Sequence, residues 1–259
     1  MKMSVLKPFK RTARQRADGS YRSQCGYVKH SQFAAAPAHY VRAFAILQKD
    51  LLELFDYVEP ADINKSCYSY RIHELHTRAC IEVEANCRAI LSENGYARAG
   101  DWNMSDYKKL EPTHHLSSFQ VRLPIWHGSD NPRTPFEEWK TGQRLPWYQA
   151  YNNVKHSRHE NFDQSNFRNM LDAMCGLVAI LAAQFIVIDF GPESFAGEDA
   201  LSKGMIWQLG GTLKSNFPMI GPPMKDMISI GVRFGTIQIQ FRHLTFDYTS
   251  EDDYDFTSV

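Results

Sequence analysis

One short segment combines residue types that could carry acid–base chemistry. Residues 147–159 read WYQAYNNVKHSRH, with an amide at Asn152, an imidazole at His156 and cations at Lys155 and Arg158. In a helix, residues four apart share a face, so Asn152 and His156 would lie side by side. Histidine gives and takes protons near neutral pH, which suits general acid–base catalysis. The two side chains could instead hydrogen-bond to each other and only fasten this helix to its neighbours.

Four stretches of helical periodicity surround and include this segment. Apolar residues recur at three- and four-residue spacing within each of them, which is typical of helices with one buried face. Gly95 is a helix-stop signal after the second stretch, and Asp163 or Ser165 is the expected cap of the fourth. The predicted helices cover about twenty residues from Pro37 onward, and about 68–94, 146–156 and 166–188.

The remaining stretches lack helical periodicity. The region 96–145 is irregular, although Phe119–Leu123 alternates like a strand and Thr134 begins a helix-start pattern. Beyond Pro192, polar and apolar residues alternate with the two-residue period of strands at 206–209, 227–234 and 236–244. We therefore predict a mainly α (α+β) fold. It comprises a four-helix bundle over 34–190 with an inserted irregular segment at about 96–145, a basic arm at 1–33 and a small C-terminal antiparallel β-appendage with an acidic tail at 191–259.

The balance of charges argues against a global attraction to nucleic acid, but the two ends differ. Lys plus Arg and Asp plus Glu number 29 each in 259 residues, and 43% of the residues are hydrophobic. Residues 1–30 hold eight Lys or Arg against the single acid Asp18, whereas 247–255 holds five acids and no base. Either these are two solvated tails that attract each other, or the basic arm binds RNA by displacing counterions from phosphates.

Cysteine usage and hydropathy predict a cytoplasmic protein without a membrane partner. The five cysteines include no CxxC pair, and three of them fall in apolar helical patterns, which favours a reducing compartment. The most apolar stretch, 173–188, has about sixteen residues, whereas a bilayer requires roughly twenty. We expect a buried core helix there.

Metal and cofactor motifs are weak, and we expect neither a metal nor a cofactor. His73 and His76 are three apart, as are His156 and His159, but neither pair has carboxylate or cysteine partners at zinc-site spacing. The sequence contains no glycine-rich phosphate loop and no GxSxG. The adjacent His114 and His115 follow Pro112 and are predicted to be solvated.

A line of polar residues runs along the second predicted helix. Glu74, Arg78, Glu82 and Asn86 lie four apart, opposite an apolar face. On an exposed surface they would form modest intrahelical pairs. Facing the bundle interior, they would have to be paired and would then mark a site.

On these residues the chain resembles the HEPN superfamily, helical-bundle proteins of bacterial toxin and antiviral defence systems, many of which are metal-independent ribonucleases. The motif of that superfamily is an arginine followed by Asn, Asp or His, with a histidine five or six residues past the arginine. Asn152 matches the polar position and His156 the histidine, while Tyr151 stands in place of the arginine. The resemblance covers the four predicted helices.

The resemblance implies an endoribonuclease in which His156 and Asn152 are catalytic and two subunits of a homodimer face one cleft. RNA would be bound by Tyr151, Lys155, Arg158 and Arg78, and one of the three cations would replace the missing arginine beside the phosphate. The tyrosine favours the alternative of a non-catalytic module that binds RNA, a nucleotide or a protein partner. A protein partner would cover the apolar sheet edge near Phe234 and Phe241.

Overall fold

The described part of the chain folds mainly as helices, as the sequence predicts. The structure, a computed structural model, describes residues 10–12, 34–123 and 125–185, together with the backbone of short strands at 2–3, 232–234, 237–241 and 254–255. The α-helices are α2 (Pro37–Phe55), α3 (Tyr70–Glu93), α4 (Met104–Tyr107), α5 (Glu111–His114), α6 (Pro146–His156), α7 (Arg158–Asn161) and α8 (Phe167–Phe185). The 3-10 helices are η2 (Asp62–Asn64), η3 (Lys108–Leu110), η4 (Leu116–Ser118), η5 (Glu137–Thr141) and η6 (Phe162–Gln164).

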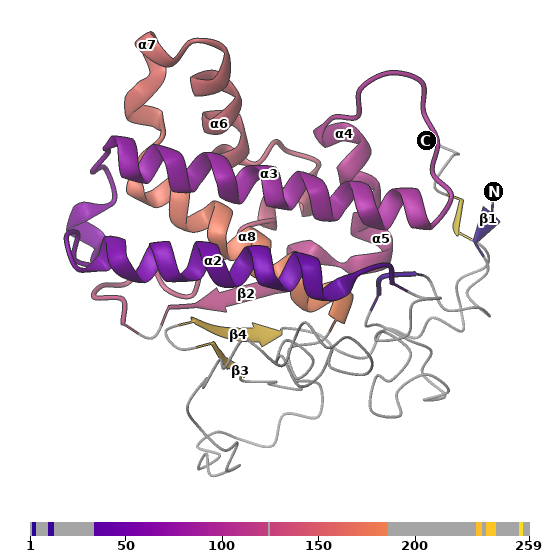
Figure 1. Ribbon diagram of the computed structural model, residues 1–259, viewed down its shortest axis with the longest axis horizontal. Coiled ribbons are helices and arrows are strands. Elements are labelled where there is room, and N and C mark those ends of the chain that lie inside the picture. The colour runs from indigo at the N-terminus through magenta and orange to yellow at the C-terminus, as the bar shows by residue number, and fades with distance from the viewer. Residues whose placement is uncertain are drawn as a thin grey trace.

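The four long helices pack on one another through α3. In Figure 1, α2 and α3 run side by side, α8 lies behind them, and α6 with α7 stands over the N-terminal half of α3. The apolar face predicted for α3 is buried against these neighbours. Burying one such aliphatic side chain stabilises the fold by roughly 1.5–3 kcal/mol, so this face is a main source of stability.

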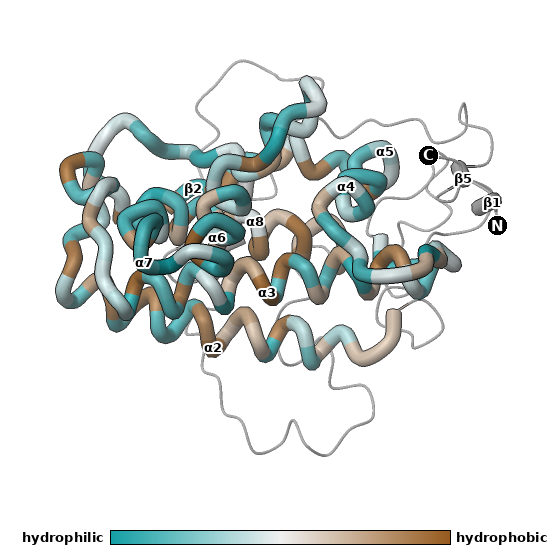
Figure 2. The backbone as a smooth tube through the Cα atoms, turned by 90° about the horizontal axis from the view of Figure 1, so that it is seen from above, coloured by the Kyte–Doolittle hydropathy of each residue, from teal (hydrophilic) through white to brown (hydrophobic). Residues whose placement is uncertain are grey.

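Helix α8 is the centre of the core. All its residues from Ala173 to Phe185 are buried, and the brown segment labelled α8 in Figure 2 lies under α6. At Gly176 an added Cβ would come within 3.2 Å of the Trp147 indole, so the glycine lets α6 approach α8 closely. Among the helices that the structure describes, none combines the length and the apolar character that crossing a membrane requires.

The ends of the helices follow local capping chemistry, with one prediction wrong. The Ser69 hydroxyl accepts the backbone N–H of Ile72 at 3.2 Å and begins α3. Gly95, with φ of 85°, ends that helix as predicted, because only glycine adopts this conformation without strain. Helix α8 is capped by neither Asp163 nor Ser165. The side chain of Asn166 accepts the N–H of Asn169 at 3.1 Å, and Ser165 is instead occupied by two histidines.

The strands pair across long stretches of sequence. β2 (Phe119–Arg122), which matches the strand predicted in the irregular region, pairs antiparallel with β4 (Ile237–Phe241), and β4 pairs antiparallel with β3 (Val232–Phe234). The backbones of β1 (Lys2–Met3) and β5 (Tyr254–Asp255) also pair antiparallel, which brings the two ends together. The strand predicted at 206–209 lies outside the described residues.

Two local predictions in the irregular region need correction. The helix expected from Thr134 is only the 3-10 turn η5, which Gly142 ends with φ of 79°. His114 is buried and not solvated. Its Nε2 lies 2.8 Å from the carbonyl oxygen of Arg11, and its Nδ1 lies 2.9 Å from the Thr113 hydroxyl. The sequence around His114 is polar, and its burial depends on tertiary contacts such as that of the N-terminal segment with the ring.

Asp62 organises the loop that follows β2. Its carboxylate accepts the backbone N–H of Ser129 at 2.8 Å and the indole N–H of Trp126 at 3.0 Å. The hydrogen bond from Ser129, followed by that from Trp126, holds the pKa of Asp62 at about 2. The loop passes so close to the carboxylate that residue 128 must be glycine, because a Cβ there would lie 2.3 Å from Asp62 Cγ.

We therefore expect the substitution Gly128→Ala to lower the free energy of unfolding by about 2 kcal/mol, since it adds a clash to an unfavourable positive φ. Gly100→Ala is the matched control, because Gly100 also has a positive φ of 83° but has nothing within 4 Å of the added Cβ. Urea denaturation of both variants measures the difference. Equal losses would show that Asp62 does not constrain the loop.

Candidate functional site

Helix α6 carries the predicted site with one buried and one open face. Trp147, Tyr151 and Val154 are buried, as the predicted apolar stripe requires, while Lys155 and His156 are exposed in the last turn. The helix ends there because Ser157 leaves the helical conformation, with φ of −146° and ψ of 68°. Cations in the last turn are favourable beside the unpaired carbonyls of a helix C-terminus. The end of α6 thus presents positive charge and an imidazole to solvent.

Three polar contacts fix α6 to its surroundings. The indole N–H of Trp147 donates to the carbonyl of Pro135 at 2.7 Å, and the carbonyl of Trp147 lies 3.0 Å from His76 Nε2 on α3. The Tyr148 hydroxyl donates to a carboxylate oxygen of Glu84 at 2.8 Å. Burial, then the charge of Glu84, raises the pKa of the Tyr148 phenol well above its ordinary value. The helix that bears the site is therefore rigidly placed.

Tyr151, which the sequence resemblance aligns with the arginine of the HEPN motif, is 5% exposed. Burial, followed by the charge of Glu84, raises the pKa of its phenol to about 12, so the hydroxyl is neutral at physiological pH. The ammonium Nζ of Lys155 lies 5.5 Å from the centroid of the Tyr151 ring, one helical turn further on. The Lys155 ammonium therefore supplies a positive charge next to the Tyr151 ring.

Asn152 and His156 share a face of α6 without a mutual bond. Among the described residues, no hydrogen bond joins their side chains, and His156 stays exposed at the helix end. The neighbouring amide, Asn153, has the structural role instead. Asn153 accepts from Gln149 at 2.9 Å and donates to Gln164 at 2.8 Å, which ties α6 to η6. The described part of the chain therefore lacks the Asn152–His156 hydrogen bond that a purely structural role of the pair would require.

A chain of hydrogen bonds links α3 to the segment after α6. Ser165 Oγ lies 2.9 Å from His76 Nδ1 and 3.1 Å from His73 Nδ1. The carbonyl of Trp147 can only accept, so His76 Nε2 carries the proton and His76 Nδ1 accepts the Ser165 hydroxyl. His73 then donates to Ser165. Burial, followed by the nearby charge of Arg158, lowers the pKa of His73.

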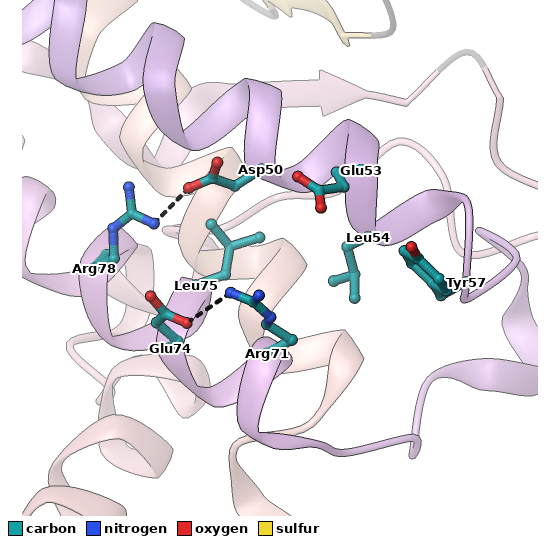
Figure 3. Close-up of a pocket in the computed structure, with 8 residues that line it drawn as sticks. All are labelled: Asp50, Glu53, Leu54, Tyr57, Arg71, Glu74, Leu75 and Arg78. Atoms are coloured by element: carbon teal, nitrogen blue, oxygen red, sulfur yellow. Dashed lines mark hydrogen bonds and ion pairs between the residues drawn. The ribbon is translucent and has the colours of Figure 1, made fainter.

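Arg78, the remaining predicted substrate-binding cation, lies apart from the α6 end. It faces α2, and its Nη1 pairs with Asp50 Oδ2 at 2.5 Å. Figure 3 shows this pair in a groove of about 140 Å³ between α2 and α3, with the ion pair of Arg71 and Glu74 beside it. The structure therefore brings Tyr151, Asn152, Lys155, His156 and Arg158 to α6 and the turn after it, and leaves Arg78 on another face of α3.

The polar line of α3 changes its environment along the helix. Glu74 is exposed, Arg78 pairs with α2, and Asn86 is fully buried. Asn86 accepts a hydrogen bond from the Gln184 amide of α8 at 2.8 Å. The start of the line therefore lies on the surface, and its end lies paired in the interior.

Within the described residues, no three His, Cys, Asp or Glu side chains gather as a metal site would require. Cys80, Cys87 and Cys175 are buried, and burial raises the pKa of each thiol. They therefore pack as thiols and are poor nucleophiles.

Comparisons with known proteins do not assign this chain to a family. No protein-family model matches it, and neither a curated protein nor a solved structure matches it either.

Proposed function

We propose that this protein is HEPN-like and acts on RNA as a metal-independent endoribonuclease at the exposed end of α6. The observation that carries the proposal is the position of Lys155. Its ammonium lies over the Tyr151 ring, and the exposed His156 follows it in the chain. An imidazole next to a cation is the minimum that RNA transesterification requires, because a proton must move while charge redistributes on a phosphate.

In the proposed reaction, His156 removes the proton from a ribose 2′-hydroxyl, which attacks the adjacent phosphorus atom. The bond from phosphorus to the 5′-oxygen breaks, and that oxygen takes a proton from the His156 imidazolium of a second subunit. Lys155 and Arg158 bind the phosphate oxygens, and Asn152 donates its amide to them or to the ribose. The proposal includes a homodimer, since one subunit offers a single exposed imidazole on α6.

A non-catalytic RNA-binding or regulatory module is the second candidate, and the burial of Tyr151 favours it. The phenol is neutral and faces inward, so it cannot supply the charge that the arginine of the motif supplies. If Lys155 does not replace that charge at the scissile phosphate, the same surface binds RNA without cutting it.

The test incubates the purified protein with total RNA and with tRNA in EDTA. We expect cleavage by the wild type and a loss of at least about 100-fold in the rate for His156→Ala, the usual contribution of a general base. His159→Ala is the matched control, because His159 is exposed just beyond α6 and has no assigned role. Thermal melting of each variant confirms that the fold is unchanged.

The possible results separate the two candidates. Cleavage that survives His156→Ala, or that His159→Ala reduces equally, would exclude His156 as the base. RNA binding without cleavage, weakened by Lys155→Met and by raised salt, would establish the non-catalytic module. If the protein neither cuts nor binds RNA, both RNA-directed candidates are overturned. Sedimentation of the wild type tests the homodimer.

The proposal extends to the fold and the setting. We propose that α2, α3, α6 and α8 form the four-helix bundle of the HEPN superfamily, with the strands beyond residue 191 as a β-appendage. The packing of α2, α6 and α8 against α3 supports this assignment. On its cysteine usage, we also propose that the protein works in the cytoplasm. By the resemblance, it would act in a bacterial toxin or antiviral defence system.

A further inference from the structure

A cluster of aromatic rings lies beside the α6 end, where the N-terminal end of α3 meets η6. The ring centroid of Phe162 is 4.8 Å from that of Tyr70, 5.8 Å from that of Tyr68 and 5.6 Å from that of His73. Phe162 is half-buried, but Tyr70 is 70% exposed and Tyr68 is 53% exposed. The two tyrosines thus rest on Phe162 and leave most of their surface open.

The backbone holds these rings in place. The N–H of Phe167 donates to the carbonyl of Cys67 at 2.8 Å, and the N–H of Arg168 donates to the carbonyl of Lys65 at 3.0 Å. The segment that carries Tyr68 is therefore fastened to the start of α8, while Tyr70 lies in the first turn of α3. Rings fixed in advance lose little conformational freedom when a flat ligand covers them.

Positive charge is available next to the rings. Arg158 lies one α7 turn before Phe162, and no ion pair occupies it among the described residues. After burial, the charge of Arg158 lowers the pKa of His73, whose ring contacts Phe162 in the cluster. Two acids lie nearby in the chain, Glu160 and Asp163. Glu160 accepts a hydrogen bond from the Ser157 hydroxyl at 2.9 Å. Exposed rings next to an unpaired arginine resemble the stacking surfaces that bind single-stranded nucleic acid.

We propose that Tyr70 and Tyr68, supported by Phe162, form a stacking site for an unpaired nucleobase, with Arg158 on the adjoining phosphate. This inference rests on the proposed function, because it assigns to the RNA at the α6 end a base that has left its duplex. The site would stack the larger purine rings more strongly than pyrimidines, and a fully paired duplex could not use it.

The experiment measures binding of a short fluorescent oligoadenylate by anisotropy. The oligonucleotide carries 2′-O-methyl groups, so it lacks the nucleophilic hydroxyl and is not cut. We expect Tyr70→Ala to weaken binding about 5- to 20-fold, the usual effect of losing one base–aromatic stack. Tyr70→Phe keeps the ring and should retain affinity. Tyr57→Ala is the second control, because Tyr57 is equally open but lines the groove between α2 and α3.

An abasic oligonucleotide of the same length distinguishes stacking from a general loss of charge or fold. It retains the phosphates and removes the bases, so Tyr70→Ala should leave its affinity unchanged. If the wild type binds oligoadenylate and Tyr70→Ala does not weaken it, or weakens the abasic strand equally, the stacking site is wrong and the proposed function stands. If the wild type binds neither strand and cuts no RNA, the proposed function is wrong, and the stacking site is wrong with it.

Discussion

Replacing Arg11 with methionine is expected to destabilise the protein by about 3–5 kcal/mol, the usual result of removing one partner from a buried ion pair. The Arg11 side chain is 1% exposed. Its Nε pairs with Glu93 at 2.6 Å, its Nη1 donates to the side-chain oxygen of Gln184 at 3.0 Å, and its Nη2 donates to the carbonyl of Ala35. Methionine matches the length of the side chain but leaves these three acceptors without their donor.

The matched control for this prediction is Arg71→Met. Arg71 is an arginine on the surface, 82% exposed, and within the described part of the chain its ion pair is to Glu74 at 3.4 Å. Exposed pairs of this kind contribute less than about 1 kcal/mol. Urea denaturation of both variants at the same pH compares their free energies of unfolding. A loss for Arg11→Met no larger than that for Arg71→Met would show that the N-terminal segment is not docked between α3 and α8.

The position of Arg11 bears on the role of the basic N-terminal arm. Arg11 ends a network that continues from Gln184 to Asn86 across the helix core. Its charge is satisfied inside the protein, so this arginine is not available to RNA phosphates. Any contribution of the arm to RNA affinity must come from its other cations, whereas Lys155 and Arg158 remain exposed on the α6 side.

Acidification is expected to remove about 3 kcal/mol of stability through His76. Burial, only partly offset by the hydrogen bond to the Trp147 carbonyl, lowers the pKa of this histidine from 6.5 to about 4. The folded protein therefore keeps His76 neutral while the unfolded chain binds a proton. This contribution is fully present above pH 6.5 and is lost as the pH falls towards 4. Protonation would also place an N–H against the hydroxyl of Ser165, which already donates to the ring.

The measurement is the free energy of unfolding between pH 7.5 and pH 4.5 for the wild type and for His76→Gln. The variant should be less stable at pH 7.5 but should lose less stability on acidification. His127→Gln provides the control, since His127 is an exposed histidine paired with Glu59 at 3.3 Å. It should reproduce the slope of the wild type. Parallel pH profiles for the wild type and His76→Gln would contradict the assignment of the acid sensitivity to His76.

The sequence by itself determined the four long helices and the face that each of them buries. Apolar spacing located α2, α3, α6 and α8 to within a few residues, because that spacing reflects which side chains leave water. The stop at Gly95 and the stripe of Trp147, Tyr151 and Val154 also followed from local chemistry. The residues that the motif placed on α6 are adjacent in the chain, so their grouping required no tertiary information.

The tertiary structure decided which polar groups meet across the chain. Nothing local marks Ser165 as the partner of His73 and His76, or Arg11 as the partner of Glu93. The burial of His114 and the pairing of β2 with β4 depend on segments about a hundred residues away. Arg78 and the α6 cations lie on different faces because α3 packs against α2 on one side and α6 on another. Periodicity reports whether a side chain is buried, but only packing determines what it meets.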